Sequence, residues 1–386
     1  MLVRRSVIVA FCLAFATGAV PGALSSPHDA KAGWIRVKPK NARSQAHHAF
    51  RARASRHADG AEAATGAGIA LGGAIQNEDS AELARDLDAV GSSGAQWIRM
   101  DVNWDVVQRD GRDSYNWAPF DRVVDAANAR GLRILATILY TPPWARPAGR
   151  AANTPPTSSA DYGAFARAVA ARYAARGIHA YEIWNEPNSS SFWAPRADAG
   201  SYAELLKAAS TAIRGVDGRA VIVTGGMSPA TDNGHDIAPV TFLKALYADG
   251  AKTSFDAVGH HPYCWPAMPG DAEGWSAWYQ MDGTSTSLRS LMTANGDGGK
   301  QIWATEFGAP TSGPSGSFVG EAAQAEMVTR AYKVFGSYKW AGPLFWYAAR
   351  DLGTSRDTRE NFFGLLHNDF TPKPAYSAFR LVSALA

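Results

Sequence analysis

The chain has 386 residues, of which 46% are hydrophobic and 19% are charged, and its net charge is +3. This length fits two or three domains or one large one, and the apolar content excludes wholesale disorder. The charge is unevenly distributed. Residues 1–58 hold ten Lys or Arg and one acidic residue, a net +9, whereas the remainder holds 28 basic and 34 acidic residues, a net −6. A basic tail before a mildly acidic body is not typical of a nucleic-acid-binding domain, so we expect no nucleic-acid partner.

The first residues have the pattern of an export signal. Residues 1–5 are positively charged, and residues 7–16 form an apolar run that is shorter than the roughly 20 residues needed to cross a bilayer. Small residues follow, as they do before a cleavage site. The sequence therefore predicts a signal peptide over 1–24 and a secreted or cell-envelope location, without stable membrane insertion after cleavage. A retained membrane anchor is the alternative.

Residues 25–65 are rich in Ala, Arg, His and Ser and show no apolar periodicity. Low hydrophobicity with one sign of charge predicts a basic, disordered linker. Its charge suits contact with an anionic cell envelope, and a plain spacer is the alternative.

Only Cys12 and Cys264 are present, and Cys12 lies in the predicted signal, so we expect no intramolecular disulfide.

The body, residues 66–386, alternates short apolar runs with longer amphipathic ones. We predict strands over 68–74, 96–101, 132–139, 179–185, 220–225, 255–261, 300–306 and 342–348. We predict helices over 79–90, 119–130, 159–176, 201–214, 240–249, 284–294, 321–337 and 373–384. Eight strict alternations indicate an α/β fold, a single (β/α)8 TIM barrel. An open doubly wound sheet is the alternative, but no G-x-G-x-x-G loop follows the first strand.

Two predicted strands end in a glutamate. The fourth runs into Trp-Asn-Glu-Pro-Asn with Glu186 at its centre, and the seventh ends in Thr-Glu-Phe-Gly with Glu306. The C-terminal ends of barrel strands meet around one mouth, where such enzymes place their chemistry. Cleavage of a glycosidic bond needs two carboxyl groups, one to protonate the leaving oxygen and one to attack or stabilise the anomeric carbon. We therefore interpret Glu186 and Glu306 as a catalytic pair.

The Asn-Glu-Pro and Thr-Glu-Phe-Gly motifs resemble those of clan A of the glycoside hydrolases. Together with Thr-Pro-Pro-Trp-Ala at 141–145, they are most similar to family 39 and its exopolysaccharide-cleaving relatives, with cellulase-like family 5 second. The resemblance covers the whole barrel, 66–386. It implies a retaining O-glycosyl hydrolase acting by double displacement, with Glu186 as general acid/base and Glu306 as nucleophile.

The resemblance also implies roles for residues that bind the substrate. Asn185 is expected to bind the sugar 2-hydroxyl, and Trp346, on the eighth strand, to lie under the reacting sugar. His261 and Tyr263 match the His-x-Tyr pattern of the clan, with the tyrosine hydroxyl near the nucleophile and the histidine on the substrate. Arg99, near the end of the second strand, is expected to keep Glu306 ionised, and an internal ion pair with Glu182 or Asp101 is the alternative.

Aromatic side chains complete the predicted site. The chain has 13 Trp, and flat indole faces suit the C–H face of a pyranose. Trp104 and Trp144 fall in predicted strand-end loops, so we expect both to contact the carbohydrate; packing in the core is the alternative for any single Trp.

We expect neither a metal nor a cofactor. His260 and His261 are adjacent, but neighbours on a strand point to opposite faces, and no H-E-x-x-H or paired Cys-x-x-Cys accompanies them. The expected partner is a poly- or oligosaccharide, such as a bacterial envelope or exopolysaccharide. A transglycosylase with the same two glutamates and a non-catalytic carbohydrate-binding barrel remain as alternatives.

Overall fold

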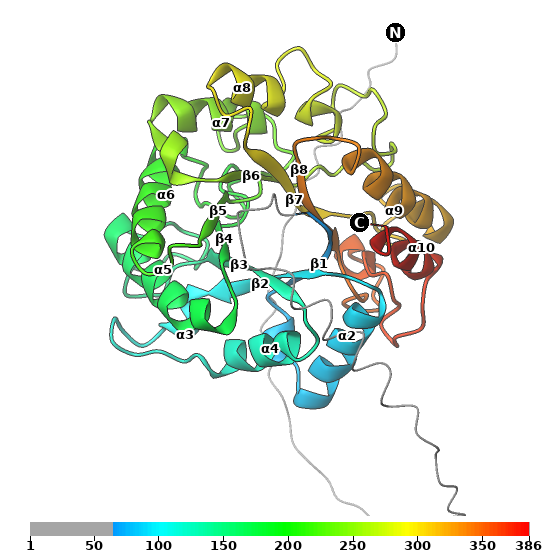
Figure 1. Cartoon of the computed structure of the whole chain (residues 1–386), viewed down its shortest axis with the longest axis horizontal. Coiled ribbons are helices and arrows are strands. Elements are labelled where there is room, and N and C mark those ends of the chain that lie inside the picture. The colour runs from blue at the N-terminus through cyan, green and yellow to red at the C-terminus, as the bar shows by residue number, and fades with distance from the viewer. Residues whose placement is uncertain (1–64, 386) are drawn as a thin grey trace, which may run out of the picture. The chain divides into compact units, whose positions relative to one another are not determined.

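A computed structural model describes residues 65–385, and it contains a closed barrel of eight parallel strands in sequence order (Figure 1). Each strand pairs with the next along the chain, and β8 pairs with β1. The strands are β1 (Ala67–Gly72), β2 (Trp97–Asn103), β3 (Arg133–Leu139), β4 (Ala180–Ile183), β5 (Val221–Thr224), β6 (Ala257–His260), β7 (Gln301–Phe307) and β8 (Ala341–Tyr347).

Helices lie outside the strands and form the outer layer (Figure 1). The α-helices are α2 (Ser80–Ser92), α3 (Trp104–Val107), α4 (Ala118–Asn128), α5 (Ser159–Tyr173), α6 (Ala199–Arg214), α7 (Pro239–Ala248), α8 (Leu288–Ala294), α9 (Glu321–Phe335) and α10 (Pro374–Ser383). Short 3-10 turns are η1 (Ile75–Asn77), η2 (Ala174–Arg176), η3 (Ala251–Ser254), η4 (Tyr279–Met281) and η5 (Arg359–Phe362).

Local sequence explains where the helices begin. The side chains of Asp79, Ser158, Asp198 and Ser287 accept hydrogen bonds from first-turn amides of α2, α5, α6 and α8, which satisfies donors that otherwise lack a partner. The helices α4, α7 and α10 have proline in the first turn, where its missing N–H costs nothing.

The barrel encloses a small apolar layer of its own. One side chain from each strand contributes to it: Ala70, Trp97, Leu135, Ala180, Val223, Ala257, Trp303 and Phe345. Because side chains alternate along a strand, residues two positions further on point inward one level higher, toward the mouth. This alternation places Arg99 and Glu182 in the barrel interior, and both are buried.

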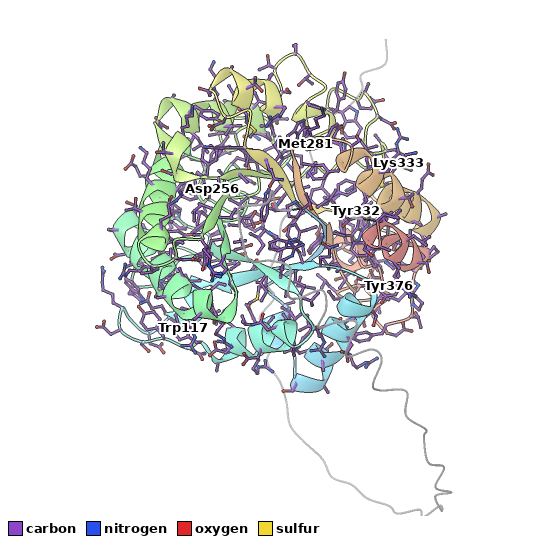
Figure 2. The ribbon with its side chains drawn as sticks, viewed as in Figure 1. Trp117, Asp256, Met281, Tyr332, Lys333 and Tyr376 are labelled. Atoms are coloured by element: carbon purple, nitrogen blue, oxygen red, sulfur yellow. The ribbon has the colours of Figure 1, made fainter. Side chains whose placement is uncertain are left out.

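The larger core lies between strands and helices (Figure 2). Tyr332 of α9 donates its hydroxyl to the carbonyl of Leu344, 3.0 Å away, and so ties the outer layer to β8. Tyr376 of α10 donates to the carbonyl of Ala89 in α2 over 2.8 Å, which joins the last helix to the first.

The predicted (β/α)8 barrel is confirmed, and all eight strands and eight helices appear near their predicted ranges. The short helix α3 was not predicted; Asn103 caps it by accepting a hydrogen bond from the amide of Val106. The predicted signal peptide (1–24) and the predicted linker (25–65, apart from its last residue) lie outside the described residues. Between residues 65 and 385, no helix is both long and apolar enough to cross a membrane.

Candidate active site

Glu186 and Glu306 meet at the mouth of the barrel. Glu186 follows β4 with a positive φ of 44°, and its amide donates to the carbonyl of Gly226 over 3.0 Å. Glu306 lies near the end of β7, where the register with β8 shifts between Ala304 and Phe307. An oxygen of each carboxyl group and a ring nitrogen of His261 all lie within 4.8 Å of one another. That proximity fits a retaining pair, whose carboxyl groups are about 5–5.5 Å apart, rather than the wider inverting arrangement.

Arg99 connects three acceptors at the floor of the mouth. Its Nη1 lies 2.6 Å from Oε1 of Glu306, its Nη2 donates to Oδ1 of Asn185 over 2.7 Å, and its Nε donates to Oε2 of Glu182 over 2.5 Å. The guanidinium of Arg99 therefore pairs both with Glu306 and with the interior carboxyl group of Glu182, which the sequence analysis gave as the alternative partner. Charge-assisted bonds of this kind are short and strongly oriented.

The segment after β6 supplies two more groups. The Tyr263 hydroxyl donates to Oε2 of Glu306 over 3.1 Å. Nδ1 of His261 lies 2.9 Å from Oε1 of Glu186 and 3.6 Å from Oε2 of Glu306. The structure thus brings together five residues that the sequence placed at the site: Glu186, Glu306, Arg99, His261 and Tyr263. Asn185 joins them through Arg99.

The surroundings shift the pKa values of the two glutamates in opposite directions. Burial raises the pKa of Glu186, and the charge of Glu306 adds to this rise, although His261 opposes it. Burial also acts to raise the pKa of Glu306, but His261, Arg99 and the Tyr263 hydrogen bond outweigh it and lower that pKa below its ordinary 4.5. At neutral pH one group therefore favours its protonated form more than the other, as an acid and a nucleophile require.

Gly226 allows the close packing beneath the site. A Cβ at this position would lie 2.2 Å from Nε2 of His261 and 2.3 Å from Oγ1 of Thr305. Any other residue would displace the imidazole from Glu186. A glycine is thus required here by contact rather than by backbone conformation.

Trp346 does not face the mouth, which corrects the sequence prediction. Its side chain is fully buried in the outer core, packs edge-on against Phe307 at 5.6 Å and donates to the carbonyl of Phe363 over 3.2 Å. The next residue, Tyr347, packs instead against the inner layer. Its pKa is raised by burial and by the charges of Glu360 and Glu306. Strand alternation therefore places Tyr347, not Trp346, beside the reacting centre.

Trp104 also lies in the core rather than at the mouth. It is fully buried in α3, stacks on Phe165 at 5.4 Å and donates to Gln108 over 2.6 Å. Trp144 is partly exposed, but it packs edge-on against Trp104 at 5.6 Å and donates to the carbonyl of Gln108. Both side chains therefore take part in core packing, and their contact with carbohydrate stays a prediction.

Two carboxyl groups at the mouth were missed as site residues. Asp101 lies two residues beyond Arg99 on β2, and burial together with the charges of Glu306 and Glu182 raises its pKa to about 7, against the opposing effect of Arg99. Glu360 belongs to η5, and burial together with Glu306 and Glu186 raises its pKa to about 7, although Arg359 opposes the rise. Strand alternation was the available signal for Asp101, whereas no local pattern marks Glu360.

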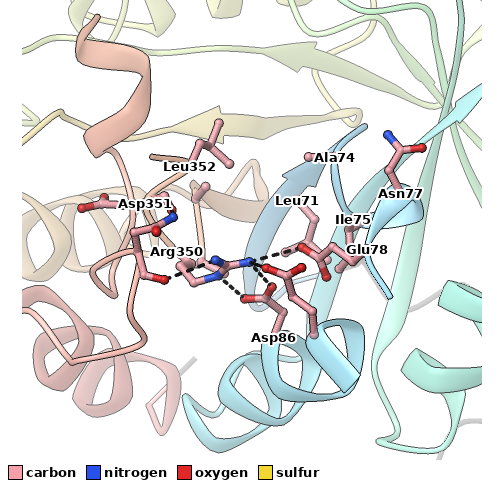
Figure 3. A pocket seen from close by; sticks show the side chains of 13 residues that line it. Leu71, Ala74, Ile75, Asn77, Glu78, Asp86, Arg350, Asp351 and Leu352 are labelled. Carbon is pink, nitrogen blue, oxygen red and sulfur yellow. Dashed lines mark hydrogen bonds and ion pairs between the residues drawn. The ribbon is translucent and has the colours of Figure 1, made fainter. Parts of the chain in front are cut away.

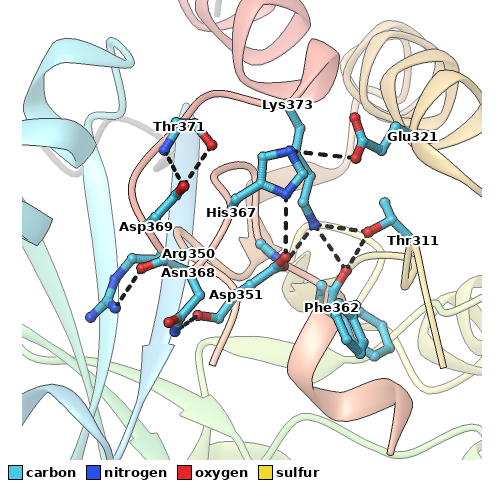
Figure 4. A network of polar contacts seen from close by, with 12 residues as sticks. Thr311, Glu321, Arg350, Asp351, Phe362, His367, Asn368, Asp369, Thr371 and Lys373 are labelled. Carbon is cyan, nitrogen blue, oxygen red and sulfur yellow. Dashed lines mark hydrogen bonds and ion pairs between the residues drawn. The ribbon is translucent and has the colours of Figure 1, made fainter. Parts of the chain in front are cut away.

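A buried ion pair anchors the loop that presents Glu360 (Figure 4). Nζ of Lys373 lies 2.6 Å from Oδ1 of Asp351 and donates to Oγ1 of Thr311 over 2.9 Å and to the carbonyl of Phe362 over 3.3 Å. Lys373 and Asp351 are 1% and 3% exposed. This network joins the start and the end of the segment between β8 and α10, so η5 is held firmly against the barrel.

A separate pocket of about 370 Å³ lies between η1, α2 and the segment after β8 (Figure 3). Arg350 spans it and pairs with Glu82 at 2.7 Å, Asp86 at 2.8 Å and Glu78 at 3.5 Å. Among residues 65–385, two sets of side chains have ligand atoms close enough to hold a metal ion. The first set is these three acids, and the second is Glu186, His261 and Glu306. In the first set the carboxyl groups pair with the guanidinium of Arg350. In the second set His261 contacts Glu186, and Glu306 accepts hydrogen bonds from Arg99 and Tyr263.

The comparisons with known proteins agree with this geometry. The family model described as "Cellulase (glycosyl hydrolase family 5)" matches residues 63–346. A family 39 glycoside hydrolase from the gut symbiont Bacteroides cellulosilyticus WH2 is 23% identical, with a TM-score of 0.65 over 84% of this chain and 64% of that one. Thus this chain spans less than two thirds of the length of that protein.

Two further structures have the same fold. A monomeric β-xylosidase from Caulobacter crescentus CB15 is 18% identical, with a TM-score of 0.61 over 83% of this chain and 68% of that one. GH5_18 from Streptomyces cattleya, solved with GlcNAc, is 18% identical, with a TM-score of 0.60 over 84% of this chain and 80% of that one. The resemblance to clan A and to its families 39 and 5 is confirmed. This chain belongs to the cellulase family, glycosyl hydrolase family 5.

Proposed function

We propose that this protein is a retaining glycoside hydrolase that cleaves O-glycosidic bonds by double displacement. The observation that carries the proposal is the meeting of Glu186, Glu306 and His261 within 4.8 Å at the mouth of the barrel. A single carboxyl group at a strand end has many uses, but two at this spacing from β4 and β7 match the requirement of the reaction.

In the first step the carboxylate of Glu306 attacks the anomeric carbon. As the new C–O bond forms, the bond to the leaving oxygen breaks, and Glu186 transfers its proton to that oxygen. Arg99 and Tyr263 each donate to one oxygen of Glu306, which keeps it ionised and aimed before the attack. The products of this step are the released alcohol and a glycosyl ester of Glu306.

In the second step water replaces Glu306. Glu186, now a carboxylate, takes a proton from the water, whose oxygen bonds to the anomeric carbon as the ester bond breaks. The ester carries no charge, so the repulsion that raised the pKa of Glu186 is absent when it must act as a base. Two inversions return the original anomeric configuration.

Asn185 is suited to bind the substrate at the centre of this reaction. Arg99 donates to its Oδ1, and no hydrogen bond from its Nδ2 to another residue is seen between residues 65 and 385. The amide N–H groups are therefore available to the sugar 2-hydroxyl, an interaction that stabilises the transition state more than the bound substrate. We propose that Tyr347, which packs on the inner layer of the barrel and feels the charge of Glu306, takes the substrate-binding role predicted for Trp346.

We propose a poly- or oligosaccharide of the bacterial envelope or an exopolysaccharide as substrate, and a secreted or envelope-associated location. The support is sequence-based: an apolar N-terminal run behind a basic start, then a basic segment suited to an anionic envelope. Loss of the export signal is expected to retain the protein in the cell, which fractionation and immunoblotting of the full chain would detect.

A screen of the purified protein against bacterial and plant polysaccharides tests the activity. We expect shorter oligosaccharides from at least one polymer, with Glu306→Ala inactive on it, and retention of anomeric configuration in the first product seen by NMR. An inverted first product would contradict the double displacement. Wild-type protein that cleaves no polymer and no aryl glycoside would contradict the hydrolase function.

A further inference from the structure

Glu182 is a fully buried carboxyl group with a complete set of donors. It lies on β4 and accepts hydrogen bonds from Nε of Arg99 over 2.5 Å, from Oγ1 of Thr137 over 2.7 Å and from the amide of Gly226 over 2.9 Å. The donors come from β2, from β3 and from the segment after β5. Arg99 and the Gly226 amide can only donate and each faces a different oxygen, so Glu182 acts as an acceptor through both of its oxygens and does not enter the proton transfers of the proposed mechanism.

The bond to Glu182 determines where Arg99 points. A guanidinium group is planar and rigid, so fixing its Nε–H edge also fixes the directions of its Nη groups. In this structure those directions lead from Nη1 to Glu306 and from Nη2 to Asn185. The two residues predicted to act on the anomeric carbon and on the neighbouring hydroxyl are thus aligned by one side chain, which is in turn held from below by Glu182.

Glu182 also shares the positive charge of Arg99. Arg99 is only 1% exposed, and a buried cation needs a compensating anion close by. If Glu306 were the only partner, the full field of the guanidinium would act on it. A more strongly stabilised carboxylate is a weaker nucleophile, because nucleophilicity falls with basicity. A second anion on Arg99 leaves Glu306 ionised but reactive.

We infer that Glu182 is a positioning residue for the reaction: it orients Arg99 toward Glu306 and Asn185 and divides the guanidinium charge between two carboxyl groups. The inference rests on the proposed role of Glu306 as nucleophile. Thr137 and the Gly226 amide belong to the same arrangement, because they orient Glu182 itself.

Several other groups also act on Glu306 and define the background of the test. They come from several elements around the mouth: Asp101 on β2, Tyr140 after β3, Glu186 after β4, His261 and Tyr263 after β6, Tyr347 on β8 and Glu360 in η5. All of them are retained when only Glu182 is changed. A shift in the titration of Glu306 is then attributable to the charge removed at position 182.

The test is the pH dependence of kcat/KM for Glu182→Gln, which keeps the shape of the side chain, removes its charge and replaces one acceptor oxygen with an NH2 group, so that at least one donor loses its partner. The stronger field of Arg99 lowers the pKa of Glu306, so the acidic limb is expected to move to lower pH. The weaker nucleophile is expected to lower kcat by about tenfold or more. Thr137→Val removes one donor and leaves all charges, so we expect a lower kcat with the acidic limb in place.

Asp217→Asn is the matched control. Asp217 is also a buried carboxylate, 5% exposed, but it lies before β5 at the opposite end of the barrel, where it contacts His179 at 2.8 Å. The Asp217→Asn variant is expected to be less stable than the wild type but to have the same pH profile of kcat/KM. An unchanged profile and an unchanged kcat per folded molecule in Glu182→Gln would overturn the inference. If Glu306→Ala, measured in parallel, retained activity, the proposed function itself would fail.

Discussion

Nδ1 of His261 lies 2.9 Å from Oε1 of Glu186, so a hydrogen bond joins the histidine to the predicted acid/base. Burial acts to lower the pKa of His261, but the charges of Glu306 and Glu186 outweigh it and raise that pKa. Since His261 is also 3.6 Å from Glu306, the three groups titrate together, and the pKa values seen in kinetics belong to the set.

The first prediction concerns the pH profile of the wild-type enzyme and of His261→Asn. Glu306 must be ionised and Glu186 protonated. We therefore expect kcat/KM to have an acidic limb below pH 4.5, where Glu306 takes up a proton, and a basic limb above pH 4.5, where Glu186 loses its proton. Removing His261 takes a lowering influence away from both glutamates. Both limbs of His261→Asn should therefore move to higher pH, and limbs that stay in place would contradict this coupling.

Glu186→Ala tests the acid/base. Loss of general acid catalysis is expected to slow substrates with poor leaving groups by about 10²–10⁴-fold. Aryl glycosides with acidic phenols need little protonation, so their first step should be slowed far less. The basic limb of the pH profile should also disappear for those substrates. Equal losses for good and poor leaving groups would indicate that another residue supplies the proton.

Tyr347 and Trp346 are neighbours with different expected effects. Tyr347→Ala removes a side chain close to Glu306 that also packs on the inner layer, so we expect kcat/KM per folded molecule to fall by about tenfold together with a loss of stability. Trp346→Phe removes a buried hydrogen bond and leaves space in the outer core, which should cost about 1–3 kcal/mol of unfolding free energy. Activity per folded molecule should then be unchanged. Kinetic and denaturation measurements on both variants test this difference. A loss of activity per folded molecule in Trp346→Phe but not in Tyr347→Ala would restore the prediction that Trp346 contacts the sugar.

The acids around Arg350 predict a dependence of stability on pH. Burial and the neighbouring Asp86 and Glu82 raise the pKa of Glu78 to about 8, although Arg350 opposes them. The folded state then holds a proton that the unfolded state releases near pH 4.5, so stability falls as the pH rises from about 4.5 to about 8.

Glu78→Gln should remove this contribution and raise the unfolding free energy at pH 8 by an amount on the order of 1 kcal/mol. At pH 4 the variant and the wild type should be nearly equal. Glu326→Gln, on the exposed face of α9, is the control and should leave stability unchanged at both values. A variant that is less stable than the wild type at pH 8 would contradict the interpretation of this cluster.

The sequence was most informative where structure follows from local periodicity. Apolar runs and amphipathic stretches alternate strictly, so the strands, the barrel and the strand-end positions of Glu186 and Glu306 were all predictable. Arg99 was predictable for the same reason, because it lies on the second strand and faces inward.

The predictions were wrong or incomplete where the sequence does not show which residues of a strand face inward, or where contacts between distant segments determine the position of a residue. Phe345, Trp346 and Tyr347 are three consecutive aromatic residues, so composition does not reveal which face of β8 is internal. The sequence places Trp104 in a loop after a predicted strand, but the short helix α3 turns this side chain into the core. The position of Glu360 depends on the distant Lys373–Asp351 pair, which no local pattern records.

The most direct test of the central claim is chemical identification of the nucleophile. The wild-type enzyme is incubated with a 2-deoxy-2-fluoro aryl glycoside of an accepted sugar, which slows release of the glycosyl-enzyme, and the labelled peptide is then sequenced by mass spectrometry. Glu306→Ala is assayed in parallel with azide on the non-fluorinated aryl glycoside. We predict the sugar on Glu306, and from the variant a glycosyl azide of inverted configuration. A label on any other residue, or turnover by Glu306→Ala without azide, would contradict the account.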